Sequence, residues 1–150
     1  LWDSSLNTPD RDAFAGAMAP GAPSTDAPVI ADGQPSWLLS HVGDEFTGLY
    51  FSGGAQLAPE LTLGLSGLAH GAIPVKPVVI VPQGQGSRLP HGLAAIEDAE
   101  DLVSQRFAAQ PGTYYLLRPD QHVCARWRQF NPDWVHAAIS RATGNSEIGM

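Results

Sequence analysis

The sequence is poor in charged residues. Only 15% of its 150 residues are Asp, Glu, Lys or Arg, against about 25% in an ordinary globular protein. Fifteen acidic residues outnumber eight basic ones, which gives a formal net charge of −7. Nucleic-acid binding needs a clustered positive surface, and so few basic residues do not supply one. The composition therefore argues against a nucleic-acid partner.

Sulfur and long apolar runs are also scarce. Cys124 is the only cysteine, so the chain can form neither an internal disulfide nor a Cys-x-x-Cys redox motif. No apolar run approaches the ~20 residues of a membrane-spanning helix. Residues 1–20 contain four charged residues in place of the apolar centre of a signal peptide. These absences favour a cytoplasmic protein with no membrane partner. The first residue is Leu1 and not Met, as expected of a fragment of a longer protein.

The first 34 residues, the arm, do not have the pattern of a folded unit. Prolines, glycines and alanines punctuate Leu1–Gln34, a composition typical of an extended segment or linker. Residues 35–150 are then the folded domain. Because a surface this poor in charge needs cover, we expect the arm to lie across the domain or across a second copy of it. Its candidate anchors are Trp2, Phe14 and Val29.

A helix at Pro59–Ala69 is the expected seat of the arm, since Gly64 and Gly67 would permit close approach. Around it, residues 35–150 predict the order helix, strand, helix, strand, helix, strand, strand, helix. The expected elements are a short helix capped by Ser36, a strand at Glu45–Phe51, the helix from Pro59, a strand at Val75–Val81, a helix at Asp98–Ala109, two strands within Gly112–Arg128, and a helix capped by Asn131. A loop is expected at Pro82–Leu93.

Within Gly112–Arg128 the pattern predicts a β-hairpin. Tyr114–Leu117 suits a strand, and Pro119 followed by Asp120 is typical of a type I turn. The second strand alternates, with one apolar face and one more polar face. The apolar face would hold Val123, Ala125 and Trp127, and the polar face His122, Cys124, Arg126 and Arg128. A parallel strand–helix–strand crossover followed by an antiparallel hairpin predicts an α/β, thioredoxin-like fold with a central mixed sheet of about four strands.

The position of a thioredoxin-type dithiol carries no sulfur. It would lie between the strand at Glu45–Phe51 and the next helix, where the sequence reads Ser52-Gly53-Gly54-Ala55-Gln56. A dithiol mechanism requires one thiolate to attack and a second thiol to resolve. Cys124 lies far along the chain, and we interpret it as a small semi-buried side chain.

Other candidate sites are weak. Gly84-Gln85-Gly86 follows a strand, but Leu89 and Pro90 stand where a dinucleotide-binding turn needs a third glycine and a helix. No two histidines have metal-ligand spacing, and the only close pair is His122 with Cys124. The acids cluster at a helix start, where the dipole favours them, and the serines lack a nucleophile-elbow motif. The residues weighed here are His41, His70, His91, His122, His136, Glu97, Asp98, Glu100, Asp101, Ser36, Ser52, Ser66 and Ser87.

The hairpin sequence is similar to one near the end of a known enzyme family. Leu116–Val123, followed by Ala125-Arg126-Trp127, resembles the C-terminal region of FAD-dependent aromatic-ring hydroxylases, in the group of 3-(3-hydroxyphenyl)propionate hydroxylase and phenol hydroxylase. Short motifs earlier in the chain agree in order with that family. They are Leu6–Asp10, Pro20–Pro23, Asp26–Pro28, and Trp37–Leu39 ahead of Gly43 and Phe46.

The resemblance implies a non-catalytic, thioredoxin-like C-terminal domain of a monooxygenase, an oxidoreductase and flavoprotein of aromatic-compound degradation. It implies FAD and NAD(P)H as cofactors of the parent enzyme, with packing on upstream flavin and substrate domains and a contribution to homodimer contacts. The family's flavin motifs match no position here, so we assign no catalytic, cofactor-binding or metal-binding residue to this chain. The alternative is a stand-alone thioredoxin-fold enzyme that uses Cys124. An upstream reading frame with a Gly-x-Gly-x-x-Gly motif would separate the two.

Overall fold

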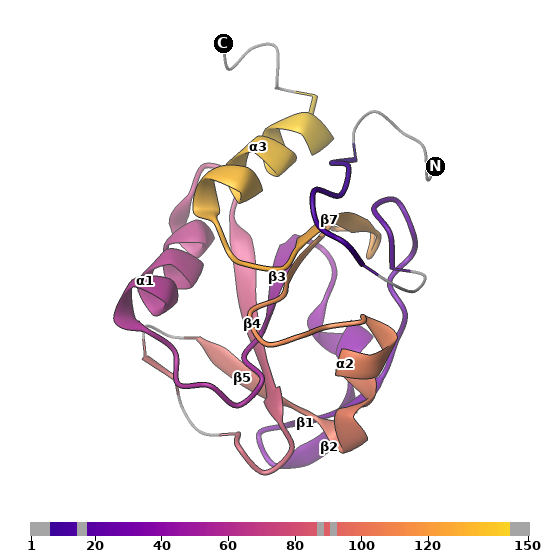
Figure 1. The fold of residues 1–150 in the computed structure, drawn as a ribbon, viewed down its shortest axis with the longest axis vertical. Helices are drawn as coiled ribbons and strands as arrows, with labels where there is room; N and C mark the ends of the chain where they lie inside the picture. The colour runs from indigo at the N-terminus through magenta and orange to yellow at the C-terminus, as the bar shows by residue number, and fades with distance from the viewer. Residues whose placement is uncertain (1–6, 15–17, 87–88, 91–92, 145–150) are drawn as a thin grey trace.

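The computed structural model describes residues 7–14, 18–86, 89–90 and 93–144, which form a seven-stranded sheet with helices on both faces (Figure 1). In chain order the elements are β1 (Pro28–Ala31), β2 (Gln34–Trp37), η1 (Leu38–His41), β3 (Phe46–Phe51), α1 (Pro59–Gly67), η2 (Leu68–His70), β4 (Val75–Pro82), β5 (Ala94–Asp98), η4 (Ala99–Asp101), α2 (Leu102–Arg106), β6 (Tyr114–Leu117), β7 (Val123–Trp127) and α3 (Pro132–Ala142). Among these described elements no helix is long and apolar enough to span a membrane.

The sheet confirms the predicted thioredoxin-like fold and has more strands than expected. Its strand order is β2-β1-β5-β4-β3-β6-β7. β3 pairs in parallel with β4 across the α1 connection, and β6 pairs antiparallel with β7, as predicted. β6 also pairs antiparallel with β3, which joins the hairpin to the parallel strands. The expectation of about four strands was too low, because β5 extends the parallel part and β1 and β2 add an antiparallel pair at the edge.

The β1–β2 hairpin was missed because its turn lies within the proline-rich stretch. Asp32 and Gly33 both have positive φ, 51° and 74°, the backbone of the two-residue turns that join tight hairpins. The hairpin crosses the boundary that we drew after residue 34. The short helix also differs from its prediction. It begins after Trp37, and the Ser36 hydroxyl contacts His41 Nε2 at 3.0 Å and caps no helix.

The helix expected at Asp98–Ala109 is only partly formed. Residues Ala94–Asp98 are strand β5, and Glu100 and Asp101 have positive φ, so the α-helix begins at Leu102. The Asp98 carboxylate nevertheless accepts the backbone N–H groups of Val103 and Ser104, at 2.7 and 2.9 Å. The acid predicted to cap this helix does so from the end of the preceding strand.

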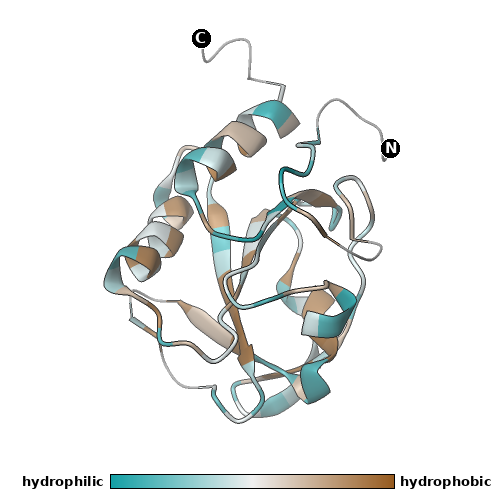
Figure 2. Cartoon of the chain, viewed as in Figure 1, coloured by the Kyte–Doolittle hydropathy of each residue, from teal (hydrophilic) through white to brown (hydrophobic). Residues whose placement is uncertain are grey.

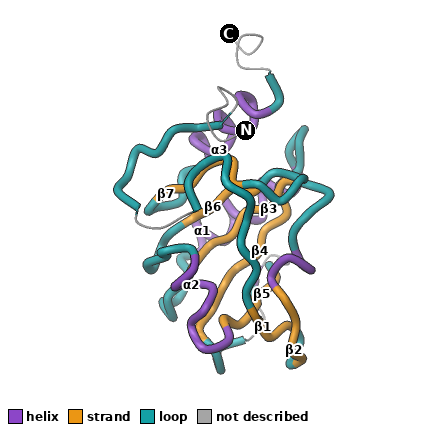
Figure 3. The backbone as a smooth tube through the Cα atoms, turned by 90° about the vertical axis from the view of Figure 1, so that its right-hand side faces the viewer, coloured by secondary structure: helices purple, strands orange, loops and turns teal. Residues whose placement is uncertain are grey.

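Two apolar layers lie on opposite faces of the sheet, because successive strand residues point to opposite sides. One layer packs under α1 and α3, and the other lies under α2, η1 and residue Met18 of the arm. Figure 2 shows brown along much of β4 and both brown and teal residues in the helices, and Figure 3 shows the face that carries α2. The alternation is clearest in β6, where Tyr114 and Leu116 belong to the first layer and Tyr115 and Leu117 to the second.

Two glycines provide a matched test of this packing. A Cβ on Gly48 in β3 would lie 1.9 Å from the Tyr114 hydroxyl oxygen, whereas a Cβ on Gly67 in α1 would meet nothing within 4 Å. We predict that Gly48→Ala lowers the free energy of unfolding by about 2 kcal/mol or more, since overpacking displaces a buried ring. Gly67→Ala should raise it by up to about 1 kcal/mol through helix propensity. Urea unfolding of both variants measures the difference, and equal effects would contradict this account of the β3–β6 contact.

Candidate functional site

The loop after β3 occupies the position of a thioredoxin-type dithiol. It is a tight turn in which Ser52 Oγ accepts the Gly54 N–H at 3.2 Å and the Ser52 carbonyl accepts the Ala55 N–H at 3.1 Å. Pro111 packs directly against Gly53 on one side. The turn therefore keeps the geometry of a loop leading into a helix, while its side chains supply hydrogen bonds and no thiol.

Cys124 is a buried thiol on the edge strand β7, two strands away from the strand that leads into this loop. It lies on β7, separated from β3 by β6, and its side chain is fully buried with Sγ 3.9 Å from the Ala138 carbonyl oxygen. Burial raises the pKa of Cys124 to about 12. Because only the thiolate attacks, this environment suppresses thiol chemistry near neutral pH. The side chain is more deeply buried than the semi-buried position expected from the sequence.

The histidines and acids weighed from the sequence are dispersed. In the residues that the structure describes, no three His, Cys, Asp or Glu side chains form a group that could hold a metal. His41 contacts Ser36, and burial lowers its pKa. Glu97 accepts the Gly84 N–H at 2.7 Å, while Asp98 caps α2, so both acids stabilise loops and helix ends. Two of the candidates, His91 and Ser87, lie outside the described residues.

The turn between β6 and β7 binds two segments that are distant in sequence, the arm and the region of η1. Arg118 binds Asp120 through Nε and Nη2, at 3.1 and 2.7 Å, and donates from Nη1 to the Asn7 side chain at 3.1 Å. The Gln121 side chain donates to the carbonyl oxygens of Leu39 and Val42, at 3.1 and 2.7 Å. The residues that carry the family resemblance thus hold the arm and η1 against the hairpin.

The arm lies along β7, the edge strand of the sheet, and not at α1 as we expected. Thr8 N–H donates to the Cys124 carbonyl at 3.2 Å, and Gly21 N–H donates to the Val123 carbonyl at 2.7 Å. Val123 N–H donates in turn to the Ala22 carbonyl at 2.8 Å. The expected seat was wrong because an edge strand offers unpaired backbone groups, which satisfy the arm better than a helix surface does.

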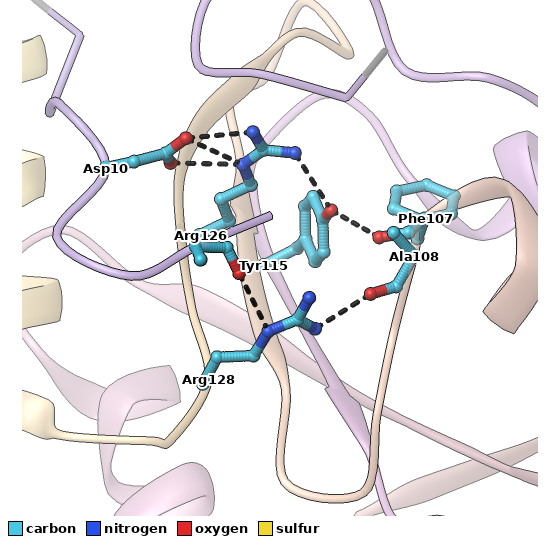
Figure 4. A network of polar contacts seen from close by, with 7 residues as sticks. Asp10, Phe107, Ala108, Tyr115, Arg126 and Arg128 are labelled. Atoms are coloured by element: carbon cyan, nitrogen blue, oxygen red, sulfur yellow. Dashed lines mark hydrogen bonds and ion pairs between the residues drawn. The ribbon is translucent and has the colours of Figure 1, made fainter. Parts of the chain in front are cut away.

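An ion pair between the buried Arg126 and the partly exposed Asp10 joins the arm to the same strand (Figure 4). The Arg126 side chain is only 4% exposed, and its guanidinium binds both carboxylate oxygens of Asp10 at 2.8 to 3.2 Å. Its Nη1 lies 3.5 Å from the Tyr115 hydroxyl, which donates to the Phe107 carbonyl. The arm and its carboxylate cover Arg126, so this part of the expected polar face is buried. The predicted alternation is wrong at Val123 and Cys124, because β7 has a bulge there: Val123 packs in the layer under α2, and Cys124 joins Ala125 and Trp127 in the layer under α1 and α3.

An aromatic contact reinforces the ion pair. The Phe14 ring lies 4.4 Å from the Arg126 guanidinium carbon and 3.9 Å from that of Arg128, and it meets Tyr115 edge-on at 5.9 Å between ring centroids. Arg128 also donates to the carbonyls of Ala13 and Ala108. Two of the predicted anchors pack on the domain: Phe14 in this cluster, and Val29 of β1, which is buried in the layer under α2. Trp2 lies outside the described residues.

The sequence offered one signal for this cluster that we did not use. Basic residues are rare in this chain, yet Arg118, Arg126 and Arg128 fall within one short hairpin. Arginines on a strand with apolar neighbours require buried partners, and the acids at positions 10 and 12 of the arm supply them: Asp10 binds Arg126, and Asp12 accepts the backbone N–H of Arg128 at 3.0 Å.

Comparison with known proteins gives the fold and no family. No family model matches the sequence, and neither does any curated protein. Among solved structures, the flavin-dependent monooxygenase PieE, in complex with FAD and substrate, matches 97% of this chain with a TM-score of 0.66 and 17% identity. Aklavinone-11 hydroxylase, in complex with FAD and aklavinone, matches 93% with a TM-score of 0.68 and 19% identity. The chain spans about a quarter of each protein, 24% and 25%.

Thiol-dependent proteins share the same fold. A yeast mitochondrial 1-Cys peroxiredoxin matches 89% of this chain with a TM-score of 0.66 and 12% identity, and the chain covers 80% of it. A pneumococcal lipoprotein thioredoxin, Etrx1, matches 77% with a TM-score of 0.56 and 13% identity. The fold is therefore thioredoxin-like, and at these identities fold alone does not decide between the two kinds of protein.

The ion pair between Asp10 and Arg126 leads to a first prediction, on the stability of the protein. Arg126→Ala should lower the free energy of unfolding by about 3 kcal/mol, and Asp10→Ala by about 2 kcal/mol, because Arg126 then loses its charged partner. A double-mutant cycle followed by urea unfolding should give a coupling of at least about 1 kcal/mol. The matched control is the more exposed Arg118–Asp120 pair, where Asp120→Ala should cost less than about 1 kcal/mol. A coupling near zero between Asp10 and Arg126 would contradict the conclusion that this ion pair holds the arm on β7.

The burial of Cys124 gives a second prediction, on the reactivity of its thiol. We expect the native protein to react with Ellman's reagent at pH 8 at least about a hundredfold more slowly than the urea-unfolded chain, because burial keeps the thiol both protonated and inaccessible. A Cys124→Ser variant serves as the blank. The same pair of proteins should have equal disulfide reductase activity. Rapid native labelling, or an activity that the variant loses, would contradict the interpretation of Cys124 as a packing residue.

Proposed function

We propose that this chain is the non-catalytic C-terminal domain of an FAD-dependent aromatic-ring monooxygenase. The observation that carries the proposal is the extent of the match to the two monooxygenases. It takes in 97% and 93% of the chain and so includes most of the arm, whereas the peroxiredoxin and Etrx1 match 89% and 77%. The hairpin motif and the absence of sulfur in the loop after β3 favour the same assignment.

In this proposal the domain has a structural task. The parent enzyme would bind FAD, take a hydride from NAD(P)H and use oxygen to hydroxylate an aromatic ring, with the flavin held by upstream domains. This chain would pack on those domains and add to contacts in a homodimer. The edge strand β7 supports such a role, because the arm seals it with backbone hydrogen bonds and leaves the domain closed along that edge.

Expression of the complete gene tests the proposal. We predict an upstream reading frame with a Gly-x-Gly-x-x-Gly motif, and a full-length protein that is yellow and oxidises NAD(P)H faster when an aromatic substrate is added. The chain described here, expressed alone, should be colourless, since no described loop forms a complete phosphate-cradling turn.

A truncation separates a structural role from a catalytic one. The full-length protein cut ahead of Leu1 should keep its flavin absorbance, because the flavin motif lies upstream, and should melt at a lower temperature. Flavin bound by the isolated chain, or an upstream sequence without a dinucleotide fingerprint, would overturn the proposal. Loss of flavin on truncation, with the fold of the remainder intact by circular dichroism, would show instead that this domain takes part in cofactor binding.

A further inference from the structure

We propose that β2 is a self-association surface, on which two copies of this chain pair antiparallel about a twofold axis at Ser36. β2 is the outermost strand of the sheet, and in the described part of the chain no strand pairs with its outer side (Figure 3). The arm covers the opposite edge, at β7. An uncovered edge strand presents backbone groups that can pair with another strand. Such a dimer would supply homodimer contacts of the proposed function, yet it depends on β2 alone and not on the identity of the parent protein.

The outer edge of β2 offers one hydrogen-bond acceptor and one donor. Leu38 N–H donates to the Ala27 carbonyl at 2.9 Å, and backbone groups alternate in direction along an antiparallel pair. Those of Pro35 and Trp37 therefore point away from β1. Pro35 has a carbonyl but no N–H. Trp37 is the residue that precedes η1 as its N-terminal cap, and the carbonyl of such a residue accepts the first bond of the helix. The Pro35 carbonyl and the Trp37 N–H are left for a partner.

A second copy of β2 matches this pattern. With Ser36 opposite its counterpart, Pro35 of each copy lies opposite Trp37 of the other. Each Trp37 N–H then donates to a Pro35 carbonyl, which gives two hydrogen bonds by symmetry. The N–H that Pro35 lacks would have faced the Trp37 carbonyl, which the helix already uses. An unrelated strand would leave an unpaired carbonyl opposite Pro35, at a cost of about 1–3 kcal/mol if it were buried, and this difference favours a second copy.

The side chains of β2 suit the same register. Trp37 is 55% exposed although it is large and apolar. Pro35, two residues earlier and so on the same face of the strand, is also exposed. Cross-strand neighbours on one face lie about 5 Å apart. Each indole ring would therefore cover a proline ring of the other copy and remove apolar area of both from water.

Charge does not oppose this pairing, although each copy carries a net charge of −7. β2 reads Gln-Pro-Ser-Trp and contains no charged residue. The acid nearest to it in sequence is Asp32, in the turn before the strand. At about 3.3 Å per residue, the two copies of Asp32 would lie roughly 26 Å apart. That separation exceeds the Debye length of about 8 Å at physiological salt, so the repulsion between them is screened.

An engineered thiol tests the register. The two Ser36 residues would form a non-hydrogen-bonded pair with Cα atoms about 4.5 Å apart, a spacing that a disulfide spans. The two Gln34 Cα atoms would be roughly 13 Å apart. We therefore expect Ser36→Cys to form a disulfide-linked dimer at least about tenfold faster than Gln34→Cys, with each rate normalised to the thiol's reaction with Ellman's reagent. Gln34 is the more exposed position, so random collision would favour it instead. The wild type, whose Cys124 is buried, is the blank.

Sedimentation equilibrium tests the association without a new thiol. Two hydrogen bonds and two ring contacts make a small interface, so we expect a dissociation constant on the order of 0.1 mM. Trp37→Lys removes the ring contacts and should weaken the dimer at least about tenfold. The matched control is Leu63→Lys on α1, where the native side chain is 56% exposed and association should not change. A protein that is monomeric at millimolar concentration, a cross-link that forms as fast through Gln34→Cys, or association weakened by Leu63→Lys and not by Trp37→Lys would each overturn the inference.

Discussion

The burial of the Arg126 guanidinium determines where the N-terminal arm of this protein binds. Arg126 projects from an edge strand into an environment that leaves it 4% exposed. A buried cation without a partner is strongly destabilising, so the fold requires a carboxylate at that point. Among the described residues from β3 to α3 no carboxylate binds Arg126, and the Tyr115 hydroxyl, 3.5 Å away, is a neutral partner. The carboxylate comes from the arm.

The need for a carboxylate beside Arg126 explains why the arm, whose composition is typical of a linker, follows a defined path along β7. Extended chain rich in proline and glycine is ordinarily mobile, and ordering each residue costs about 1–2 kcal/mol of conformational entropy. Here Asp10 binds Arg126, the Phe14 ring lies against two guanidinium groups, and backbone hydrogen bonds follow β7 as far as Val123. Each contact satisfies a backbone group or a guanidinium group of β7 and its flank that the rest of the sheet does not pair. Arm and strand are therefore parts of one structure.

The sequence predicted the elements whose signals are local, and failed where a partner distant in sequence decides. The strands β3 and β4, the β6–β7 hairpin and α3 with its Asn131 cap follow from periodicity, turn chemistry and capping. β1, β2 and β5 were missed because a four- or five-residue strand with prolines or acids becomes a strand only through its neighbours. The seat of the arm was wrong for the same reason: Asp10 and Arg126 are far apart in sequence, and strand alternation does not predict what covers a face. Alternation also misplaced Val123 and Cys124, because it does not predict the bulge in β7.

The same distinction governs the candidate sites. The absence of a dithiol could be predicted, since it depends only on which residues follow β3. The burial of Cys124 was underestimated, because it depends on α3 closing over β7. A cleft beside Ser52, between the loops after β3 and β4, was not foreseen at all, for it is made by two loops about thirty residues apart and by the register of β3 on β4. In a thioredoxin-like fold that lacks its thiols, the carboxyl ends of the parallel strands still leave room beside the loop. What the absence of sulfur in this loop removes is thiol chemistry at that position; the concavity is a property of the sheet and its connections.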